Sequence, residues 1–206
     1  LWIILSQLHW SKEASALLVI AFGASLTGGL HLDGLMDTAD GIAAGEERCL
    51  KAMRDSSVGA MGVIALAIAL LIQIASLIRL GNLAIFILPI TTFWGRYAPI
   101  WAIDQFSYLH PAGAGAFHKK HWKGLFEESK PTVFCLIIMV IIINTLPVSI
   151  KAILNLGLIL SLPIALLIPH LLGKRLGGHS GDSYGASVVT VETAIMILFS
   201  FFFQVI

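Results

Sequence analysis

The sequence predicts an all-α fold, a polytopic bundle of transmembrane helices. Of the 206 residues, 57% are hydrophobic and only 12% are charged, with a mean hydropathy of +0.90. A soluble domain carries roughly twice that share of charge. Six apolar stretches have the length of about 17–25 residues that a helix needs to cross a bilayer, and no alternating strand pattern or long linker separates them. Residues 1–206 are therefore interpreted as one integral-membrane domain.

The predicted spans follow these apolar stretches along the chain. They are 14–30, 58–80, 83–103, 132–149, 151–172 and 186–206. Residues 1–10 are interpreted as the end of a further span, and because the chain begins with Leu1 we expect an N-terminal segment to be missing. The fourth stretch is rich in β-branched residues, but in lipid a helix satisfies its own backbone. Three prolines can kink or end their helices: Pro147, Pro163 and Pro169.

Three long polar segments connect the spans, together with two tight turns. The long segments are 31–57, 104–131 and 173–185. With six spans, all three fall on one side of the membrane. Most Lys and Arg residues lie in them, whereas the other side carries Lys12, Arg79 and Lys151. The positive-inside rule therefore places the long segments in the cytoplasm.

Three acidic residues follow the first apolar stretch at Asp33, Asp37 and Asp40. At about 100° per residue they fall within roughly 60° of one another around a helix. Carboxylates that close repel one another, and a nearby bilayer raises the cost, so we expect bound cations. Carboxylate oxygens favour Mg²⁺ or Mn²⁺ over zinc. The alternative is a purely structural acidic face. The preceding Thr27-Gly28-Gly29 can loosen the first span.

The rest of the first long segment predicts a short interfacial helix and a second group of charges. The residues from Glu46 to Arg54 are typical of an amphipathic helix at the membrane surface. Its apolar side carries Cys49, Leu50 and Met53. Asp55 is either an N-cap of the next span or a fourth acid that faces the triad. Lys51 and Arg54 either bind phosphate there or face lipid head groups.

Charged residues inside the predicted spans indicate a polar interior. Arg96 is the one basic residue well inside a span, and it either faces a polar pocket or snorkels to the interface. Glu192 lies inside the last span and needs a partner. The segment 104–131 carries several His and Lys residues, which suits polyanions or head groups. A metal site formed by its histidines is the alternative.

The glycine-rich segment 173–185 is a candidate phosphate-binding loop. Glycines such as Gly178 and Gly181 can present backbone N–H groups to an anion, and Asp182 adds a carboxylate. Together with the acid triad this predicts a carboxylate-bound metal centre that suits displacement at phosphorus. Mg²⁺ would neutralise a diphosphate, and a carboxylate would accept the attacking hydroxyl's proton. A divalent-cation transporter is an alternative, but transporter sites usually lie near the bilayer midplane.

Two stretches resemble the cobalamin synthase family, the adenosylcobinamide-GDP ribazoletransferases. They are GGLHLDGLMDTADGIAAGEERCLKAMRDSSVGAMGVIAL at 28–66 and GGHSGDSYGA at 177–186. The resemblance implies a membrane-embedded catalytic domain that uses one or two Mg²⁺ ions. The implied reaction transfers the adenosylcobinamide phosphoryl group from adenosylcobinamide-GDP to α-ribazole or its 5′-phosphate, forms cobalamin or its 5′-phosphate, and releases GMP. CDP-alcohol phosphotransferases, whose Asp-x-x-Asp-Gly start resembles residues 37–41, are the alternative class.

The residues and the resemblance together give the expected site. We expect Asp33, Asp37 and Asp40 as metal ligands and Asp55 and Asp182 as catalytic residues. We expect substrate binding by His31, Lys51, Arg54, Arg96, Gly178 and Gly181. The expected setting is the prokaryotic cytoplasmic (inner) membrane, with the active site facing the cytoplasm. The expected partners are the two substrates and membrane lipid but not nucleic acid, and a homo-oligomer is left open.

Overall fold

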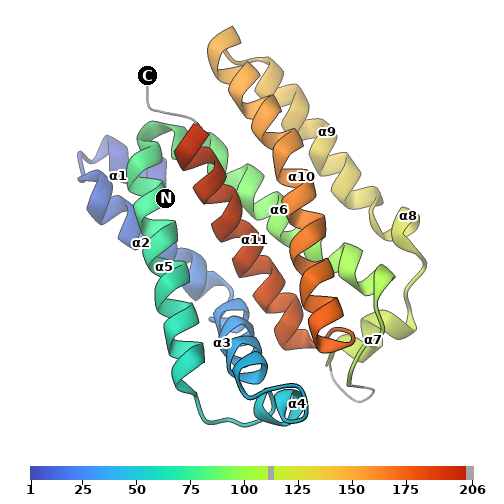
Figure 1. Ribbon diagram of the computed structural model, residues 1–206. Helices are drawn as coiled ribbons and strands as arrows, with labels where there is room; N and C mark the ends of the chain where they lie inside the picture. The colour runs from blue at the N-terminus through green and yellow to red at the C-terminus, as the bar shows by residue number, and fades with distance from the viewer. Residues whose placement is uncertain (111–113, 203–206) are drawn as a thin grey trace.

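The computed structural model describes residues 1–110 and 114–202, and within these ranges the chain is helical with no strand (Figure 1). The helices are α1 (Trp2–Gln7), α2 (Lys12–Leu26), α3 (Leu30–Ala43), α4 (Cys49–Ala52), α5 (Ala60–Leu80), the 3-10 turn η1 (Gly81–Leu83), α6 (Ala84–Gln105), α7 (Ala114–Lys120), α8 (Leu125–Glu128), α9 (Lys130–Asn144), α10 (Val148–Leu176) and α11 (Gly181–Phe202). The predicted all-α membrane fold is confirmed.

Three helical stretches of the described chain are long and apolar enough to cross a membrane: Ala60–Gln105, Val148–Leu176 and Gly181–Phe201. The bent pair of α2 and α3 makes a fourth if it counts as one span. The first stretch has 46 residues, about 69 Å of helix, which is more than twice a bilayer core of about 30 Å. It reverses direction at η1, so α5 and α6 each correspond to one predicted span (Figure 1).

Two of the six predicted spans are shorter than expected. The stretch 14–30 forms α2, which has 15 residues and ends at Leu26. The stretch 132–149 forms α9, which has 15 residues and ends at Asn144. Pro147 is then the N-cap of α10, at a helix start, where the missing N–H of a proline leaves no intrahelical hydrogen bond unmade. Pro163 and Pro169 lie inside α10 and do not end it.

Helix α11 is the centre of the bundle, since α3, α5, α6 and α10 all pack against it (Figure 1). The apolar core forms where these helices meet. Its fully buried members include Leu77, Ile87, Leu154, Ile195 and Phe199. The ring of Phe199 lies against the backbone of Gly157 in α10, a position that a side chain at residue 157 would occupy. Small residues of this kind allow membrane helices to approach closely.

A sharp bend turns the chain from α2 into α3. The two helices meet at 88°, and Gly28 and Gly29 adopt φ values of 59° and 76°, which glycine reaches without steric cost. The predicted loosening at Thr27-Gly28-Gly29 is therefore confirmed. After the bend, α3 runs along α11 and α5, so its acidic residues lie where those two helices begin.

The predicted interfacial helix is much shorter than expected. Only Cys49–Ala52 is helical, a single turn instead of the range from Glu46 to Arg54. One turn fixes several backbone dihedrals for few hydrogen bonds and is unstable alone, so it depends on packing against α3. Cys49 and Met53 are buried as predicted, and Met53 packs against Gly41 of α3.

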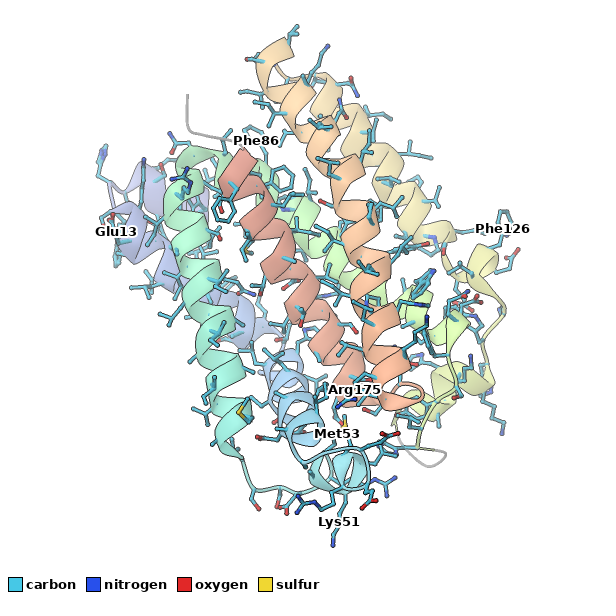
Figure 2. The ribbon with its side chains drawn as sticks, viewed as in Figure 1. Glu13, Lys51, Met53, Phe86, Phe126 and Arg175 are labelled. Atoms are coloured by element: carbon cyan, nitrogen blue, oxygen red, sulfur yellow. The ribbon has the colours of Figure 1, made fainter. Side chains whose placement is uncertain are left out.

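The three long polar segments meet at one end of the bundle (Figure 1). Arg54 contacts His110 with 2.6 Å between Nη2 and Nδ1, and the Leu109 N–H donates to the His179 carbonyl at 2.7 Å. The predicted grouping of these segments is confirmed. Figure 2 shows Lys51, Met53 and Arg175 at this end, with Glu13 toward the other.

Candidate functional site: an acidic cluster with a basic rim

Helix α3 carries two adjacent stripes that fix the position of its acids. Its buried residues are Gly34, Thr38 and Gly41, whose spacing puts them on one face. Each is preceded by an aspartate, so the acidic stripe is rotated by about 100° from the packed stripe. Asp33 is exposed, whereas Asp37 and Asp40 are half-buried. The acids therefore line the edge of a tightly packed helix face.

Asp182, in the first turn of α11, joins these acids because Gly34 allows the two helices to touch. A Cβ at residue 34 would lie 2.5 Å from the Asp182 carbonyl oxygen and 3.0 Å from its Cα. The charges of Asp33, Asp182 and Asp40 all act on the carboxyl group of Asp37. We call these four residues the acidic cluster, with Asp37 at its electrostatic centre.

Asp40 has a structural task that the sequence did not reveal. Its two carboxylate oxygens accept the backbone N–H groups of Gly59 and Gly62, each at 2.8 Å. The first N–H groups of a helix have no partner within that helix, so Asp40 caps α5 from a different helix. A side chain at residue 59 or 62 would collide with this carboxylate, which explains the glycines at both positions.

The three acids of α3 do not form one preassembled ligand set. Within the described residues, no three His, Cys, Asp or Glu side chains are placed to hold an ion between them. Asp33 and Asp40 share a side of the helix but are separated by about 10.5 Å along its axis. The carboxylates of Asp33, Asp37 and Asp182 still fit Mg²⁺ chemically, because this ion is commonly held by one or two carboxylates with waters and substrate phosphates.

Replacing Asp40 should cost stability. Asp40→Ala leaves two helix-end N–H groups without their partner, so we expect a loss of about 1–3 kcal/mol and a lower melting temperature in detergent. Asp40→Asn keeps one acceptor oxygen, so its melting temperature should fall between those of the wild type and Asp40→Ala. Asp33→Ala is the control, since Asp33 is exposed. Equal melting temperatures for Asp40→Ala and the wild type would contradict the capping role.

Asp55 does not take the position expected for a fourth acid. It is fully exposed, and its carboxylate accepts both the N–H, at 2.9 Å, and the hydroxyl of Ser57. These bonds lower the pKa of Asp55, with a smaller contribution from Lys51. It does not cap α5 either, because Gly59 is the N-cap. The acid that joins the triad is Asp182.

Basic residues lie at the same end of the bundle as the acidic cluster. Lys51 is exposed and points outward (Figure 2), and Arg54 contacts His110. Arg175 lies close enough to α4 for its charge to act on the Cys49 thiol, although burial dominates and raises that pKa. We call Lys51, Arg54 and Arg175 the basic rim. Cations beside carboxylates suit a ligand with several phosphates.

The glycine-rich loop does not present the expected row of free N–H groups. Four consecutive backbone donors are used inside the protein: Gly177 and Gly178 donate to the Gly173 carbonyl, His179 to the Ser107 carbonyl and Ser180 to the Ser183 hydroxyl. These four N–H groups are therefore not available to the phosphate that the glycine-rich segment was expected to bind. Gly178 instead allows close packing, since a Cβ there would lie 2.7 Å from the Ser107 carbonyl oxygen. The side of Gly181 is more open, because a Cβ there would come no closer than 3.9 Å to its nearest neighbour.

His179 holds this loop in place, a role that no pattern in the sequence indicated. It is fully buried. Its Nε2–H donates to the Pro169 carbonyl at 3.0 Å and its Nδ1 bonds the Ser183 hydroxyl at 2.9 Å, while the ring stacks on Tyr184. Burial lowers the pKa of His179 to about 4, so the ring is neutral. It therefore fixes the turn that delivers Asp182 to the cluster.

Arg96 and Glu192 form an ion pair with 2.8 Å between Nη1 and Oε1, joining α6 to α11. Gly95 permits this approach, since a Cβ there would lie 2.6 Å from the Glu192 Cγ. Both residues line a cavity of about 440 Å³, together with His31. Arg96 therefore lines a cavity, and it is the partner that Glu192 needed.

The fold and the site define the class of protein: an integral-membrane enzyme with a carboxylate site at one end of a helical bundle. Residues 1–200 match the family model for cobalamin-5-phosphate synthase. The chain belongs to this family and is a transferase of cobalamin biosynthesis. The family that residues 28–66 and 177–186 indicated is confirmed.

Several curated relatives are named adenosylcobinamide-GDP ribazoletransferase. That of Prochlorococcus marinus strain SARG is 53% identical over 201 residues, which are 96% of this chain and 78% of the relative. That of Thermosynechococcus vestitus is 40% identical, over 92% of this chain and 74% of the relative. That of Desulforamulus reducens is 40% identical, over 84% of this chain and 68% of the relative. No solved structure matches the chain.

Proposed function

We propose that the protein transfers the adenosylcobinamide phosphoryl group from adenosylcobinamide-GDP to α-ribazole or its 5′-phosphate. A hydroxyl oxygen of the acceptor forms a bond to the phosphorus attached to cobinamide, the bond from that phosphorus to GMP breaks, and GMP leaves. The products are adenosylcobalamin, or its 5′-phosphate, and GMP. The shared name of the relatives supports both substrates. The observation that carries the proposal is the contact between α3 and the start of α11 at Gly34, which brings Asp182 to the acids around Asp37.

Different residues of the site bind the donor, accept the proton and position the proton acceptor. The basic rim binds the diphosphate of the donor, because Lys51, Arg54 and Arg175 lie at the same end as the acids. Asp182 accepts the proton of the attacking hydroxyl, a role that needs a carboxylate held in place. His179 and Gly34 hold it there, one through the loop and the other through backbone contact.

We propose Mg²⁺ as the cofactor, one or two ions held by Asp33 and Asp37 with Asp182 nearby. When bound, Mg²⁺ neutralises the charge of the diphosphate and of the departing GMP. The support is chemical: α3 and the adjoining start of α11 bring the four acids of the cluster to one region, and the charges of Asp33, Asp182 and Asp40 act on the carboxyl group of Asp37. Such a group is unfavourable without a cation.

Mg²⁺ should stabilise the protein through this cluster. Because the ion relieves repulsion among carboxylates that is present only in the folded state, millimolar Mg²⁺ should raise the melting temperature of the detergent-solubilised protein. The Asp33→Asn/Asp37→Asn double variant should lose this response and, without Mg²⁺, melt no lower than the wild type. A Mg²⁺ response that survives in the double variant would place the ion elsewhere.

The direct test is incubation of membranes containing the protein with adenosylcobinamide-GDP, α-ribazole 5′-phosphate and Mg²⁺, with GMP release as the signal. We expect GMP in amounts equal to the cobalamin 5′-phosphate formed, and none when the acceptor is omitted. GMP release that is independent of the acceptor would indicate hydrolysis and would refute the proposed transfer.

We further propose that the site faces the cytoplasm from the inner membrane, because most Lys and Arg residues lie in the segments that build it. Single cysteines at residues 47 and 118, in a chain without its native cysteines, should both react with an impermeant maleimide in inverted vesicles and not in intact spheroplasts. Opposite labelling of the two positions would contradict this topology.

A further inference from the structure

The cavity beside Arg96 differs from the acidic cluster in both its walls and its position. It lies between α1, α2, α3, α5, α6 and α11. Its polar lining includes His31, Gln73, Arg96 and Glu192, while the remaining walls are mostly aliphatic and aromatic, for example Phe22, Leu88 and Met196. Apolar walls with a few polar groups are typical of a small-molecule site, and about 440 Å³ lies in the lower part of the usual range.

The Arg96–Glu192 pair in the cavity wall has hydrogen-bond donors available for a ligand but no net charge. Arg96 donates to Glu192 through Nη1, and 42% of its side chain remains exposed. A guanidinium has five N–H donors, so others remain for a ligand. Because the pair is neutral as a whole, it suits a ligand with hydrogen-bond acceptors and an uncharged, apolar body.

The cavity adjoins the acidic cluster along the chain of α3. His31 and Leu32 line the cavity, and Asp33 follows directly in the chain. Gly185 of α11 packs against His31, with a hypothetical Cβ 3.2 Å from its Cα. The same helix pair that brings Asp182 to the acids therefore also lines the cavity.

We propose that this cavity seats the aromatic base of α-ribazole, the acceptor, and so orients its ribose toward the acidic cluster. The inference rests on the proposed function and assigns one of its two substrates to a place. The donor carries a corrin ring and a charged diphosphate and is too large and too polar for this space. The acceptor is a riboside with a flat apolar base. It matches the size of the cavity, its apolar walls and its neutral Arg96–Glu192 pair.

A substitution that fills the cavity tests the proposal. Gly23 lines it, and a Cβ at this position meets no atom within 4 Å, so Gly23→Leu adds bulk to the cavity without a collision. We expect the KM for α-ribazole to rise at least tenfold, with the KM for adenosylcobinamide-GDP and the melting temperature unchanged. Ala21→Leu is the control, since Ala21 is an exposed residue of the same helix that does not line the cavity.

Equilibrium dialysis of α-ribazole against the detergent-solubilised protein measures the same contact without catalysis. The wild type and Ala21→Leu should bind it, and Gly23→Leu should bind it at least tenfold more weakly. Equal binding by all three proteins would overturn the proposal, as would a phospholipid that co-purifies with the wild type and is lost from Gly23→Leu while the KM for α-ribazole stays the same. Absence of any product from wild-type membranes would refute the proposed function instead, and dialysis would still decide the occupant of the cavity.

Discussion

Asp37→Asn should lower kcat by at least about 100-fold, the scale seen when a charge-stabilising group is lost from an active site. Asp37 is the acid on which Asp33, Asp40 and Asp182 all act, so an amide at this position removes the central negative charge. The change is nearly isosteric and leaves the packing of α3 intact. Initial rates of GMP formation at saturating substrates give the measurement.

The control for Asp37→Asn is Glu127→Gln, the same change from acid to amide at an exposed residue that pairs with Lys130. Its kcat should match that of the wild type. The melting temperature of Asp37→Asn should equal or exceed that of the wild type, because removing one of several repelling carboxylates does not destabilise the fold. That of Glu127→Gln should stay close to the wild type, because an exposed ion pair contributes about 1 kcal/mol at most. Full activity of Asp37→Asn would exclude the acidic cluster as the reaction centre.

Gly34→Ala should also lower kcat, although it adds a single methyl group. That group would lie 2.5 Å from the Asp182 carbonyl oxygen, and its nearest neighbours are all backbone atoms of Asp182, so no flexible side chain can yield. The two helices must separate, which moves Asp182 away from Asp33 and Asp37. We expect kcat to fall by at least about tenfold, since small displacements of catalytic groups cost large factors in rate.

The melting temperature distinguishes this effect from a general effect of glycine replacement. Within a helix, Ala is favoured over Gly by about 1 kcal/mol, so Gly23→Ala, which enters open space, should not lower the melting temperature. Gly34→Ala should lower it despite the better helix propensity. A Gly34→Ala protein that is as stable and as active as the wild type would show that α3 and α11 do not need this contact.

Sequence reasoning located the helices of this protein closely but not the partners of its polar groups. Predicted spans 58–80 and 83–103 correspond to α5 and α6 within two residues at each end, because lipid forces a long apolar stretch to be helical. The prediction of an amphipathic helix from Glu46 to Arg54 was wrong. Only one turn forms, and that turn depends on packing against α3 rather than on its own periodicity.

The sequence alone contains the spacing of both the stripe of acids and the stripe of small residues on α3. The spacing of Asp33, Asp37 and Asp40 sets their common side of a helix, since helical geometry depends only on position along one chain. The spacing of Gly34, Thr38 and Gly41 was an equally readable sign of close packing that sequence reasoning overlooked.

The sequence by itself therefore determined the membrane fold, the family and the acidic side of one helix. Only the tertiary structure decided which of the acids caps α5, which residue completes the cluster, and that Arg96 pairs with Glu192. It also decided that the N–H groups of the glycine-rich loop are already occupied. The physical reason is that propensity and periodicity act within one helix, whereas hydrogen bonds and ion pairs between helices depend on which backbones touch, and here glycines at 34, 95 and 185 set those contacts.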